Sequence, residues 1–193
     1  REGMEAFIAS QAYNYLPCLT DSQEKLQSLL DDFAADFCFT SSEQAWAALI
    51  LTLEESNVKS FLKKWKTSTH FQKDVEHIVT IFKNRLTAEL NKEQVYQFGK
   101  NLIYRAEELR QAMGMSVDFE RIDVLDKSLT IHDKHEIVVN GGMLIKELGL
   151  KPGPQMGQVL SQVERAIVHG DFANEKEAIF DFVKDCLEDT EKG

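Results

Sequence analysis

The segment from Asn140 to Gly170 constrains the fold of this chain more than any other. It joins two apolar helical stripes through a turn rich in Gly and Pro. Gly149 follows the first stripe and is typical of a left-handed helix stop. The sequence Leu-Lys-Pro-Gly-Pro at 150–154 cannot continue a helix, and the φ angle of Pro154 suits the first turn of the next one. We therefore predict a helix, a tight turn, and a second helix that ends at Gly170.

This turn has two interpretations. Backbone N–H groups at the start of the second helix point in one direction, which suits a bound phosphate. Turns of the same composition are also common in helical hairpins that bind no ligand. The local pattern alone favours the plain hairpin, and both interpretations stay open at this point.

Helical periodicity extends over almost all of the remaining chain. Only 3 prolines occur, and Ile137-Val138-Val139 is the one β-branched cluster. The sequence therefore predicts an all-α fold. Residues 129–139 are expected to form a short helix or an extended connector. The other expected helices lie at residues 5–15, 22–33, 43–53, 58–65, 71–86, 91–113, 116–126 and 175–187.

Capping signals mark several of these helix starts. Ser42 and Asn57 are expected to cap the helices that follow them. Capping boxes are expected at Thr69 with Gln72, at Asn91 with Gln94 and at Asn174 with Glu177. The pattern is interrupted at residues 109–117, where we expect a break between a larger helical subdomain and a smaller one that carries the hairpin.

Size and composition limit the class of protein. A chain of 193 residues with 43% hydrophobic residues can bury a core in one large or two small domains. We find no apolar run long enough for a bilayer and no signal peptide, so we expect a cytoplasmic protein without a membrane partner. Cys18, Cys38 and Cys186 are odd in number and far apart, as expected of reduced thiols. The chain begins at Arg1 rather than Met, as a piece of a longer protein would.

The charge is unevenly distributed. The net charge is −10, which is unusual for a nucleic-acid binder. Residues 1–58 carry 2 basic and 10 acidic groups, whereas residues 59–85 carry 7 basic and 2 acidic groups. We call residues 59–85 the basic band. It lies on two consecutive expected helices and could contact an RNA backbone, with Trp65 and Phe71 interleaved. Alternatively, its lysines are an ordinary solvated face over a core that includes Phe61, Leu62, Trp65 and Phe71.

No motif for catalysis or metal binding is evident. The pair His132-Asp133 with His135 could ligate a metal only with matching groups on neighbouring helices, and no such spacing is present. We find no P-loop, no Gly-rich dinucleotide motif, no paired-carboxylate motif and no activated nucleophile. We therefore expect no catalytic residue and no metal ligand in this chain.

A longer pattern runs through the hairpin and the last helix. Its positions are Asn140-Gly141, Leu144-Ile145, Gly149, Pro152-Gly153-Pro154, Gly157, Val163-Glu164, Ala166-Ile167-Val168, Gly170 and Asn174-Glu175-Lys176-Glu177-Ala178-Ile179. Through this pattern the chain resembles the carboxy-terminal half of the bacterial CCA-adding tRNA nucleotidyltransferases, in their Gram-positive form. Weaker matches are the Tyr-Leu-Pro-Cys-Leu sequence at 15–19 and the Phe-Leu-Lys-Lys-Trp-Lys sequence at 61–66.

The resemblance implies a domain assignment and a division of labour. Residues 1–20 would be the end of the neck, residues 21–113 a helical body and residues 114–193 a helical tail. Such enzymes add C, C and A to the 3′ end of tRNA from CTP and ATP with Mg²⁺, in head and neck domains that this chain does not contain. The fragment alone would be inactive. Its partner would be tRNA, held at the acceptor stem and TψC arm, while the oligomeric state, including a homodimer, stays open.

The expected RNA-binding residues follow from the basic band and the hairpin turn. They are Lys59, Lys63, Lys64, Lys66, Lys73, Lys83, Arg85, Lys151, Gly153, Gln155 and Gly157. The alternatives are a helical protein-interaction domain without an RNA partner, and the equivalent region of a poly(A) polymerase.

Overall fold

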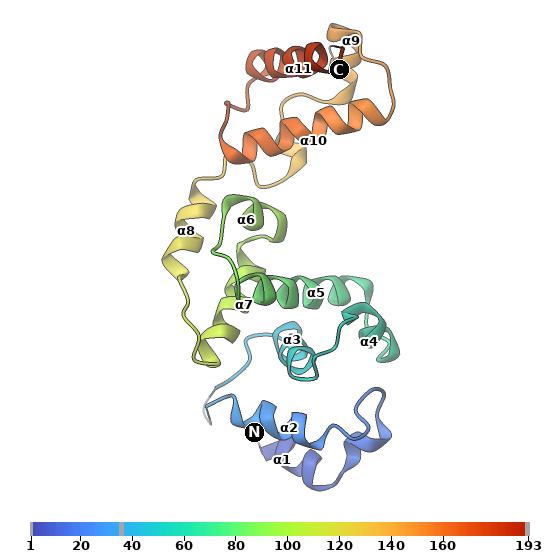
Figure 1. Cartoon of the computed structure of the whole chain (residues 1–193), viewed down its shortest axis with the longest axis vertical. Helices are drawn as coiled ribbons and strands as arrows, with labels where there is room; N and C mark the ends of the chain where they lie inside the picture. Colours follow the sequence, from blue (N-terminus) through green and yellow to red (C-terminus); the bar gives the residue numbers. More distant parts are fainter. Residues whose placement is uncertain (1, 35–36, 192–193) are drawn as a thin grey trace. The chain divides into compact units, whose positions relative to one another are not determined.

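The computed structural model describes residues 2–34 and 37–191, and only the backbone at residues 188–191. These residues form helices, turns and connectors without a strand, which confirms the predicted all-α class (Figure 1). The chain divides into two compact units. Unit 1 comprises residues 1–89 and 101–122, and unit 2 comprises residues 90–100 and 123–193. These boundaries differ from the expected neck, body and tail, whose assignment stays a prediction.

Unit 1 is built around helix α5. Its elements are α1 (Glu2–Ala9), the 3₁₀ helix η1 (Ala12–Tyr15), α2 (Gln23–Asp31), α3 (Ser42–Thr52), α4 (Val58–Lys64), α5 (Thr69–Asn84), most of α7 (Lys100–Ala112) and the start of α8 (Phe119–Lys127). Helix α5 packs on α3 and α4. Its apolar residues Val75 and Ile78 recur at helical spacing and are fully buried. They meet an equally buried face that includes Ile50 of α3 and Leu62 of α4.

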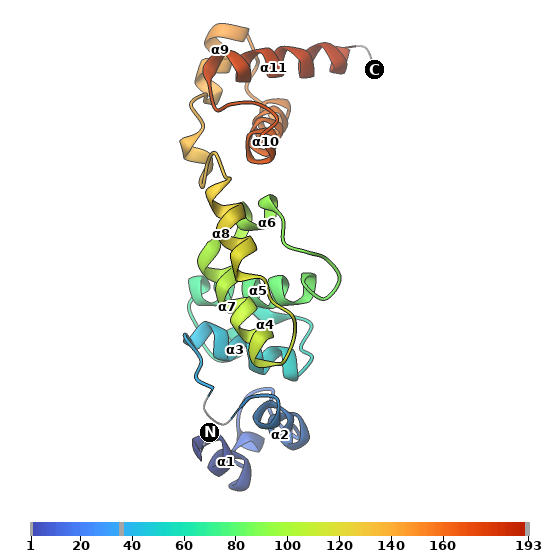
Figure 2. The ribbon, with the colours of Figure 1, turned by 90° about the vertical axis from the view of Figure 1, so that its left-hand side faces the viewer.

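Unit 2 is built around helix α10. Its elements are α6 (Lys92–Phe98), the 3₁₀ helix η2 (Lys134–Glu136), α9 (Gly141–Leu148), α10 (Pro154–His169) and α11 (Lys176–Glu191). Helix α10 packs against both α6 and α11, and α9, α10 and α11 lie together in both views (Figures 1 and 2). A Cβ at Gly141 would lie 3.0 Å from Met156 Sδ. Glycine at 141 thus lets the start of α9 approach α10 closely.

The Gly-Pro hairpin forms as the sequence predicts. Asn140 accepts a hydrogen bond from Met143 N at 3.1 Å and caps α9. Gly149 ends α9 with φ 68°, and Gly170 ends α10 with φ 85°, both in the left-handed region that favours glycine. Pro154 occupies the first turn of α10.

Other helix starts agree with the sequence only in part. The expected caps Asn57 and Asn91 are confirmed, the latter with its capping box to Gln94. The caps of α3 and α5 lie one residue earlier than predicted, at Ser41 and Ser68. Each serine side chain accepts a hydrogen bond from the backbone N–H three residues later, at Gln44 and Phe71. Ser42 and Thr69, the caps predicted from the sequence, are already the first residues of their helices and therefore cannot act as the cap.

Two expected helices are interrupted. The predicted helix over residues 91–113 is divided at Gly99, whose φ of 77° is incompatible with a helix and separates α6 from α7. The predicted helix over residues 5–15 is divided at Gln11, which has φ 56° and separates α1 from η1. Gly99 is itself a residue type that commonly ends helices, so this break had a local signal, whereas Gln11 is neither Gly nor Pro.

Asn174 does not form the predicted capping box. Its side-chain amide donates to Glu136 O at 2.8 Å and accepts from Val138 N at 3.1 Å. The side chain therefore fastens the segment after η2 to the start of α11. This segment belongs to residues 129–139, for which the sequence predicted either a short helix or an extended connector. That range contains the short 3₁₀ helix η2.

Replacing Asn174 by alanine tests this correction. We expect the Asn174→Ala variant to lose about 1–2 kcal/mol of unfolding free energy, because two backbone groups lose their partner. Asn174→Asp keeps the acceptor for Val138 N and should lose less. Chemical unfolding followed by circular dichroism measures the difference. Equal stability of Asn174→Ala and wild type would contradict the role of this side chain.

Candidate nucleic-acid interface

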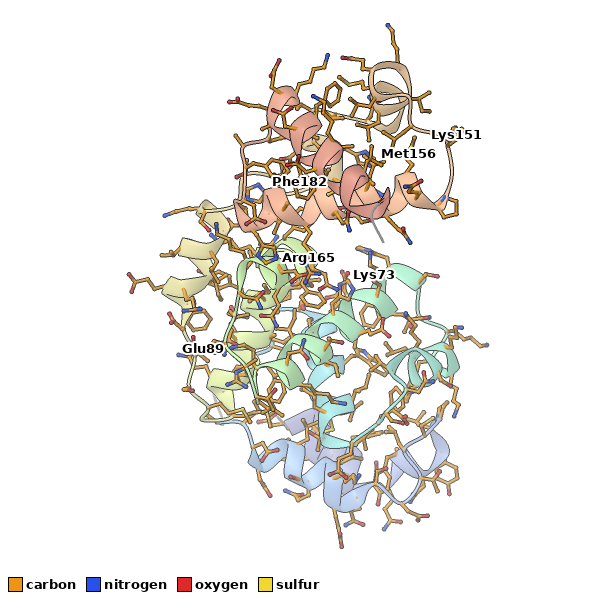
Figure 3. All side chains as sticks on the ribbon, turned by 45° about the horizontal axis from the view of Figure 1, so that its top comes forward. Lys73, Glu89, Lys151, Met156, Arg165 and Phe182 are labelled. Atoms are coloured by element: carbon orange, nitrogen blue, oxygen red, sulfur yellow. The ribbon has the colours of Figure 1, made fainter. Side chains whose placement is uncertain are left out.

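Exposed lysines of the basic band are presented by α4, α5 and the turn between them. Asn57 fixes the start of α4 and Ser68 the start of α5. The turn passes through Lys66, which has φ 54°. The lysines with exposed side chains are Lys59, Lys63, Lys64, Lys66, Lys73 and Lys83. Figure 3 labels Lys73, which projects from the amino-terminal part of α5.

Two of these lysines contact other groups of unit 1. Lys59 Nζ lies 2.9 Å from Glu76 Oε2 in an exposed ion pair. Lys64 Nζ donates to Cys18 Sγ at 3.2 Å, which ties the turn after η1 to α4. Lys63, Lys66, Lys73 and Lys83 have no ion pair among the residues that the structure describes. Their ammonium groups are accessible to an anionic partner.

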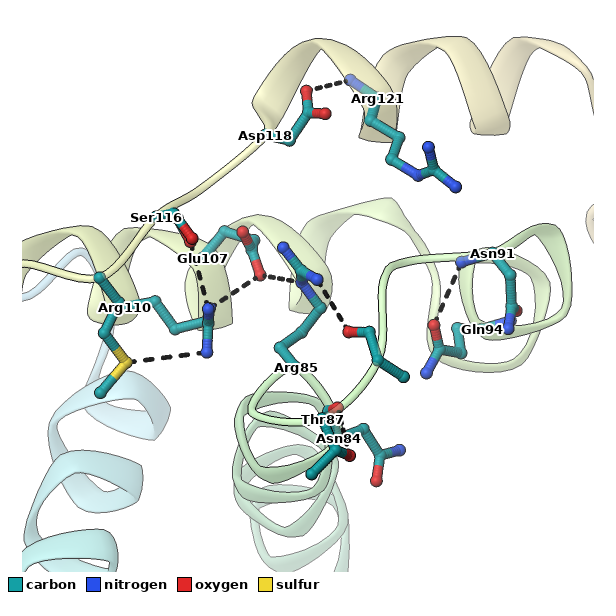
Figure 4. A network of polar contacts seen from close by, with 12 residues as sticks. Asn84, Arg85, Thr87, Asn91, Gln94, Glu107, Arg110, Ser116, Asp118 and Arg121 are labelled. Atoms are coloured by element: carbon teal, nitrogen blue, oxygen red, sulfur yellow. Dashed lines mark hydrogen bonds and ion pairs between the residues drawn. The ribbon is translucent and has the colours of Figure 1, made fainter.

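Arg85 differs from the lysines of the basic band. Its Nε donates to Glu107 Oε1 at 2.8 Å, and its side chain is 11% exposed. Glu107 is fully buried and also lies against Arg110, as Figure 4 shows. The sequence placed Arg85 among the RNA-binding candidates, but the structure places it in this internal charge cluster. We leave it out of the proposed surface.

The aromatic residues of the band pack in one cluster of unit 1, with Phe61 buried and Trp65 and Phe71 half-buried. Phe61 is 2% exposed, and the rings of Trp46 and Trp65 meet edge to face with centroids 5.0 Å apart. Phe71 contacts Trp46 in the same cluster, at 6.4 Å between centroids. The core interpretation of the sequence holds for Phe61 and Leu62, whereas Trp65 and Phe71 are half-buried. Because their rings pack on one another, we assign them no contact with RNA.

His77 adds little charge to this surface. Burial is the main cause that lowers the pKa of His77, and the positive charge of Lys73 lowers it further. The imidazole is therefore neutral near pH 7. The positive charge of the α4–α5 surface comes from its lysines.

The hairpin turn gives unit 2 a second candidate surface. Lys151, Gly153, Gln155 and Gly157 are all exposed, whereas Met156 between them is buried against the unit (Figure 3). Gly153 precedes α10 and offers no side-chain cap. In the first turn of α10, Pro154 has no N–H, Gly157 N donates to Gly153 O at 3.4 Å, and Met156 is buried. The exposed backbone at Gln155, together with Lys151, is therefore the part of this turn that suits a phosphate.

The histidines noted in the sequence form no metal site in the part of the chain that the structure describes. His132 Nε2 lies 3.4 Å from Asp126 Oδ1, and Asp133 Oδ1 accepts from His135 N at 2.8 Å to cap η2. Over the described ranges, no three His, Cys, Asp or Glu side chains gather as metal ligands would. In the same ranges, none of the helices has the length and apolarity to cross a membrane.

Unit 2 also contains a cavity of 560 Å³ that no sequence motif predicted. Its lining comes from α6, from the segment around η2 and from α10, which are far apart in the chain. Tyr96 and Glu164 form the principal contact across it, and no local motif connects them.

Comparisons with known proteins show which family the sequence of this chain matches. Residues 37–183 match the family model described as tRNA nucleotidyltransferase domain 2. A CCA-adding enzyme of Streptococcus agalactiae serotype V is 58% identical over 189 residues, which are 98% of this chain and 47% of that protein. A CCA-adding enzyme of Streptococcus thermophilus is 54% identical over 184 residues, covering 95% of this chain and 46% of that protein.

A solved structure has a similar fold. It is described as the crystal structure of Bacillus stearothermophilus CCA-adding enzyme in complex with CTP. The TM-score is 0.81 at 27% identity, and the match covers 92% of this chain and 46% of that one. The chain thus spans about half the length of the relatives that it matches.

Proposed function

We propose, from the premise that this chain belongs to the tRNA nucleotidyltransferase family of the CCA-adding enzymes, that it is the tRNA-holding part of such an enzyme. The complete enzyme would add C, C and A to the tRNA 3′ end from CTP and ATP with Mg²⁺. We assign the nucleotide and metal sites to the part of the relatives that this chain does not cover. The chain by itself would bind tRNA without extending it.

The exposed lysines of α4 and α5 carry this proposal. Lys63, Lys64, Lys66 and Lys73 would contact phosphates of the acceptor stem, with Lys59 and Lys83 at their margin. Duplex RNA has a deep, narrow major groove that side chains cannot read, so a protein grips it mostly through phosphates and shape. Lysines that project into solvent from a rigid helical unit suit such a grip, because they need no base to be exposed.

The hairpin turn would provide a second grip. We propose that Lys151 and the backbone around Gly153, Gln155 and Gly157 contact phosphates of the TψC arm. The neck, body and tail assignment at residues 1–20, 21–113 and 114–193 is part of the same proposal. The role of both grips is positional, since they would hold the tRNA 3′ end where the missing domains react with it.

A binding assay with the isolated chain tests the proposal. We expect a mobility shift with tRNA at lower protein concentration than with a DNA duplex of equal length, because the helical geometry and 2′-hydroxyls of RNA differ from those of DNA. Binding should weaken steeply as salt increases. Failure to bind tRNA at low salt would contradict the proposal and favour a helical protein-interaction domain.

The choice between CCA addition and poly(A) addition needs the complete protein. We expect the full-length enzyme to incorporate both CTP and ATP into a tRNA that lacks its terminal CCA. Incorporation of ATP alone would identify a poly(A) polymerase instead.

A further inference from the structure

The 560 Å³ cavity of unit 2 has the size of a small-molecule site. Helix α6 contributes Glu93, Tyr96 and Gln97, the segment at 132–134 contributes His132, Asp133 and Lys134, and α10 contributes Ser161, Glu164, Arg165 and Val168. A volume between about 300 and 1,000 Å³ is typical of sites for drug-sized ligands and cofactors. The cavity is distinct from the α4–α5 surface and from the hairpin turn, because it shares no residue with them.

One of the hydrogen bonds between α6 and α10 lies in the wall of this cavity. Tyr96 Oη donates to Glu164 Oε1 at 2.7 Å. Burial, and then this bond, raise the pKa of Tyr96, so the phenol keeps its proton and stays a donor at physiological pH. Glu164 is half-buried, and its second oxygen, Oε2, has no hydrogen-bond partner among the described residues. The pair thus holds a carboxylate oriented by Tyr96, in which Oε2 can accept two hydrogen bonds and Oε1 can accept one more.

The other charged side chains of the lining differ in whether they already have a partner. Glu93 already has partners, since its Oε2 lies 3.4 Å from Arg165 Nη2 and 3.8 Å from His169 Nε2. Asp133 caps η2 through Oδ1. Lys134 is exposed and has no ion pair among the residues that the structure describes. Arg165 is bonded to Glu93 through Nη2 alone and keeps its other N–H donors. The groups with capacity for a ligand are therefore a carboxylate at Glu164 and cations at Lys134 and Arg165.

One ligand class matches an oriented carboxylate, cations and an aromatic wall together. A carboxylate accepts amino and imino N–H groups of a nucleobase, and cations bind its phosphate. Guanine presents its N1–H and its 2-amino group side by side, so it offers one carboxylate two donors. Uracil offers a single imino N–H and no amino group. Tyr96 adds a ring edge and Gln97 and Ser161 add neutral polar groups for the sugar.

We propose that this cavity binds one guanosine nucleotide, with the base on Glu164 and the phosphate on Lys134 and Arg165. The nucleotide could be an unstacked residue of an RNA or a free nucleoside monophosphate, since both present the same groups. If it belongs to tRNA, this inference rests on the proposed function and adds a base-reading contact to the two phosphate grips.

Calorimetric titration of the 193-residue chain with GMP and UMP tests the chemistry. We expect GMP to bind at least about tenfold more tightly than UMP, because guanine donates two hydrogen bonds to the charged carboxylate of Glu164 and uracil donates one. Glu164→Gln should reduce GMP affinity by a similar factor and reduce UMP affinity less, because uracil donates one hydrogen bond to the carboxylate where guanine donates two. Glu177→Gln makes the same charge change at an exposed position of α11 and should bind GMP as wild type does. Equal binding of GMP and UMP, or of GMP by wild type and Glu164→Gln, would overturn the proposal.

A second variant guards against misfolding of the first. Lys134 is exposed on η2, so Lys134→Ala should fold normally. It should lose affinity for GMP but not for guanosine, which lacks the phosphate. An equal loss for both ligands, or no loss for GMP, would contradict the assigned phosphate position.

Competition with tRNA separates the two sources of the nucleotide. If the ligand is an RNA residue, tRNA should displace GMP from the wild-type chain. If GMP binds a tRNA-saturated chain undiminished, the cavity takes a free nucleotide. Failure of the proposed function would appear as absent tRNA binding with the GMP titration intact. Failure of this inference would appear as normal tRNA binding with no discrimination between GMP and UMP.

Discussion

Replacing Lys63, Lys64 and Lys66 by glutamate should weaken tRNA binding by this chain on the order of a hundredfold at low salt. Each substitution removes a cation that can face a phosphate and introduces an anion in its place. A loss of roughly 1 kcal/mol for each of three contacts corresponds to about a hundredfold in the dissociation constant. All three side chains are exposed. The bond from Lys64 to Cys18 that the variant loses is also exposed, so the fold should be kept.

The salt dependence gives a sharper readout than the affinity itself. The slope of log K against log salt concentration is close to 0.9 for each phosphate neutralised on duplex nucleic acid. Loss of three contacts should therefore make the slope shallower by about three. Filter binding across a salt series measures both quantities. If the slope stays unchanged while affinity falls, the variant acts through structure rather than through phosphate contacts.

A control variant separates local contacts from overall charge. Lys127, Lys146 and Lys184 are also exposed and lie outside the basic band and the hairpin turn. Their joint replacement by glutamate changes the net charge of the chain by the same amount. We expect a much smaller effect, limited to long-range repulsion that salt screens. Equal effects of the two triple variants would mean that net charge, and not the α4–α5 surface, governs binding.

The sequence predicted best those features that depend on neighbours in the chain. Asn91 caps α6 through a bond to a residue three positions on, and Gly149 and Gly170 end their helices through their own φ angles. Such signals are complete within one helical turn. This explains why the hairpin and the all-α class could be predicted without a structure.

The errors at Asn174, at Arg85 and at the cavity occurred where a distant residue decides. Asn174 has the spacing of a helix cap, but partners near Val138 compete for its side chain. Arg85 appears in sequence as one of seven cations in the basic band, and only the approach of Glu107 from α7 shows that it is internal. The cavity at Tyr96 and Glu164 requires three separated segments to meet. No pattern within a local window contains that information.

Removing the negative charge of Glu107 should destabilise unit 1 severely. Glu107 is fully buried between Arg85 and Arg110, whose side chains are 11% and 6% exposed. The Glu107→Gln variant keeps the size of the side chain but leaves two guanidinium groups without a counter-charge. Breaking a buried ion pair in this way costs about 3–5 kcal/mol. Burial already lowers the pKa of Arg110, a tendency that Glu107 opposes.

Tryptophan fluorescence makes this measurement specific to unit 1. The chain has 2 tryptophans, Trp46 and Trp65, and both lie in this unit. Urea unfolding followed by their emission should give a strongly lowered midpoint for Glu107→Gln. Glu120→Gln removes a charge from an exposed residue of the same unit. It should change the free energy of unfolding by at most about 0.5 kcal/mol and so leave the midpoint almost unchanged. Similar midpoints for the two variants would show that Glu107 is not the counter-charge of the cluster.

Replacing all three charged residues by apolar ones tests whether charge balance or the hydrogen bonds of the arginines to the backbone stabilise this cluster. The cluster is imperfectly satisfied, since Glu107 Oε2 and Arg110 Nε are buried without a hydrogen bond in the described part of the chain. Arg85 and Arg110 also hold backbone carbonyls, at Ala88 O and Ser116 O. A variant with Arg85→Leu, Glu107→Leu and Arg110→Met removes every charge and both of these bonds. We expect it to be more stable than Glu107→Gln by at least about 2 kcal/mol, because unpaired buried charges cost more than lost pairs. If it is instead the less stable of the two, the arginine bonds to the backbone, rather than charge balance, hold this part of unit 1 together.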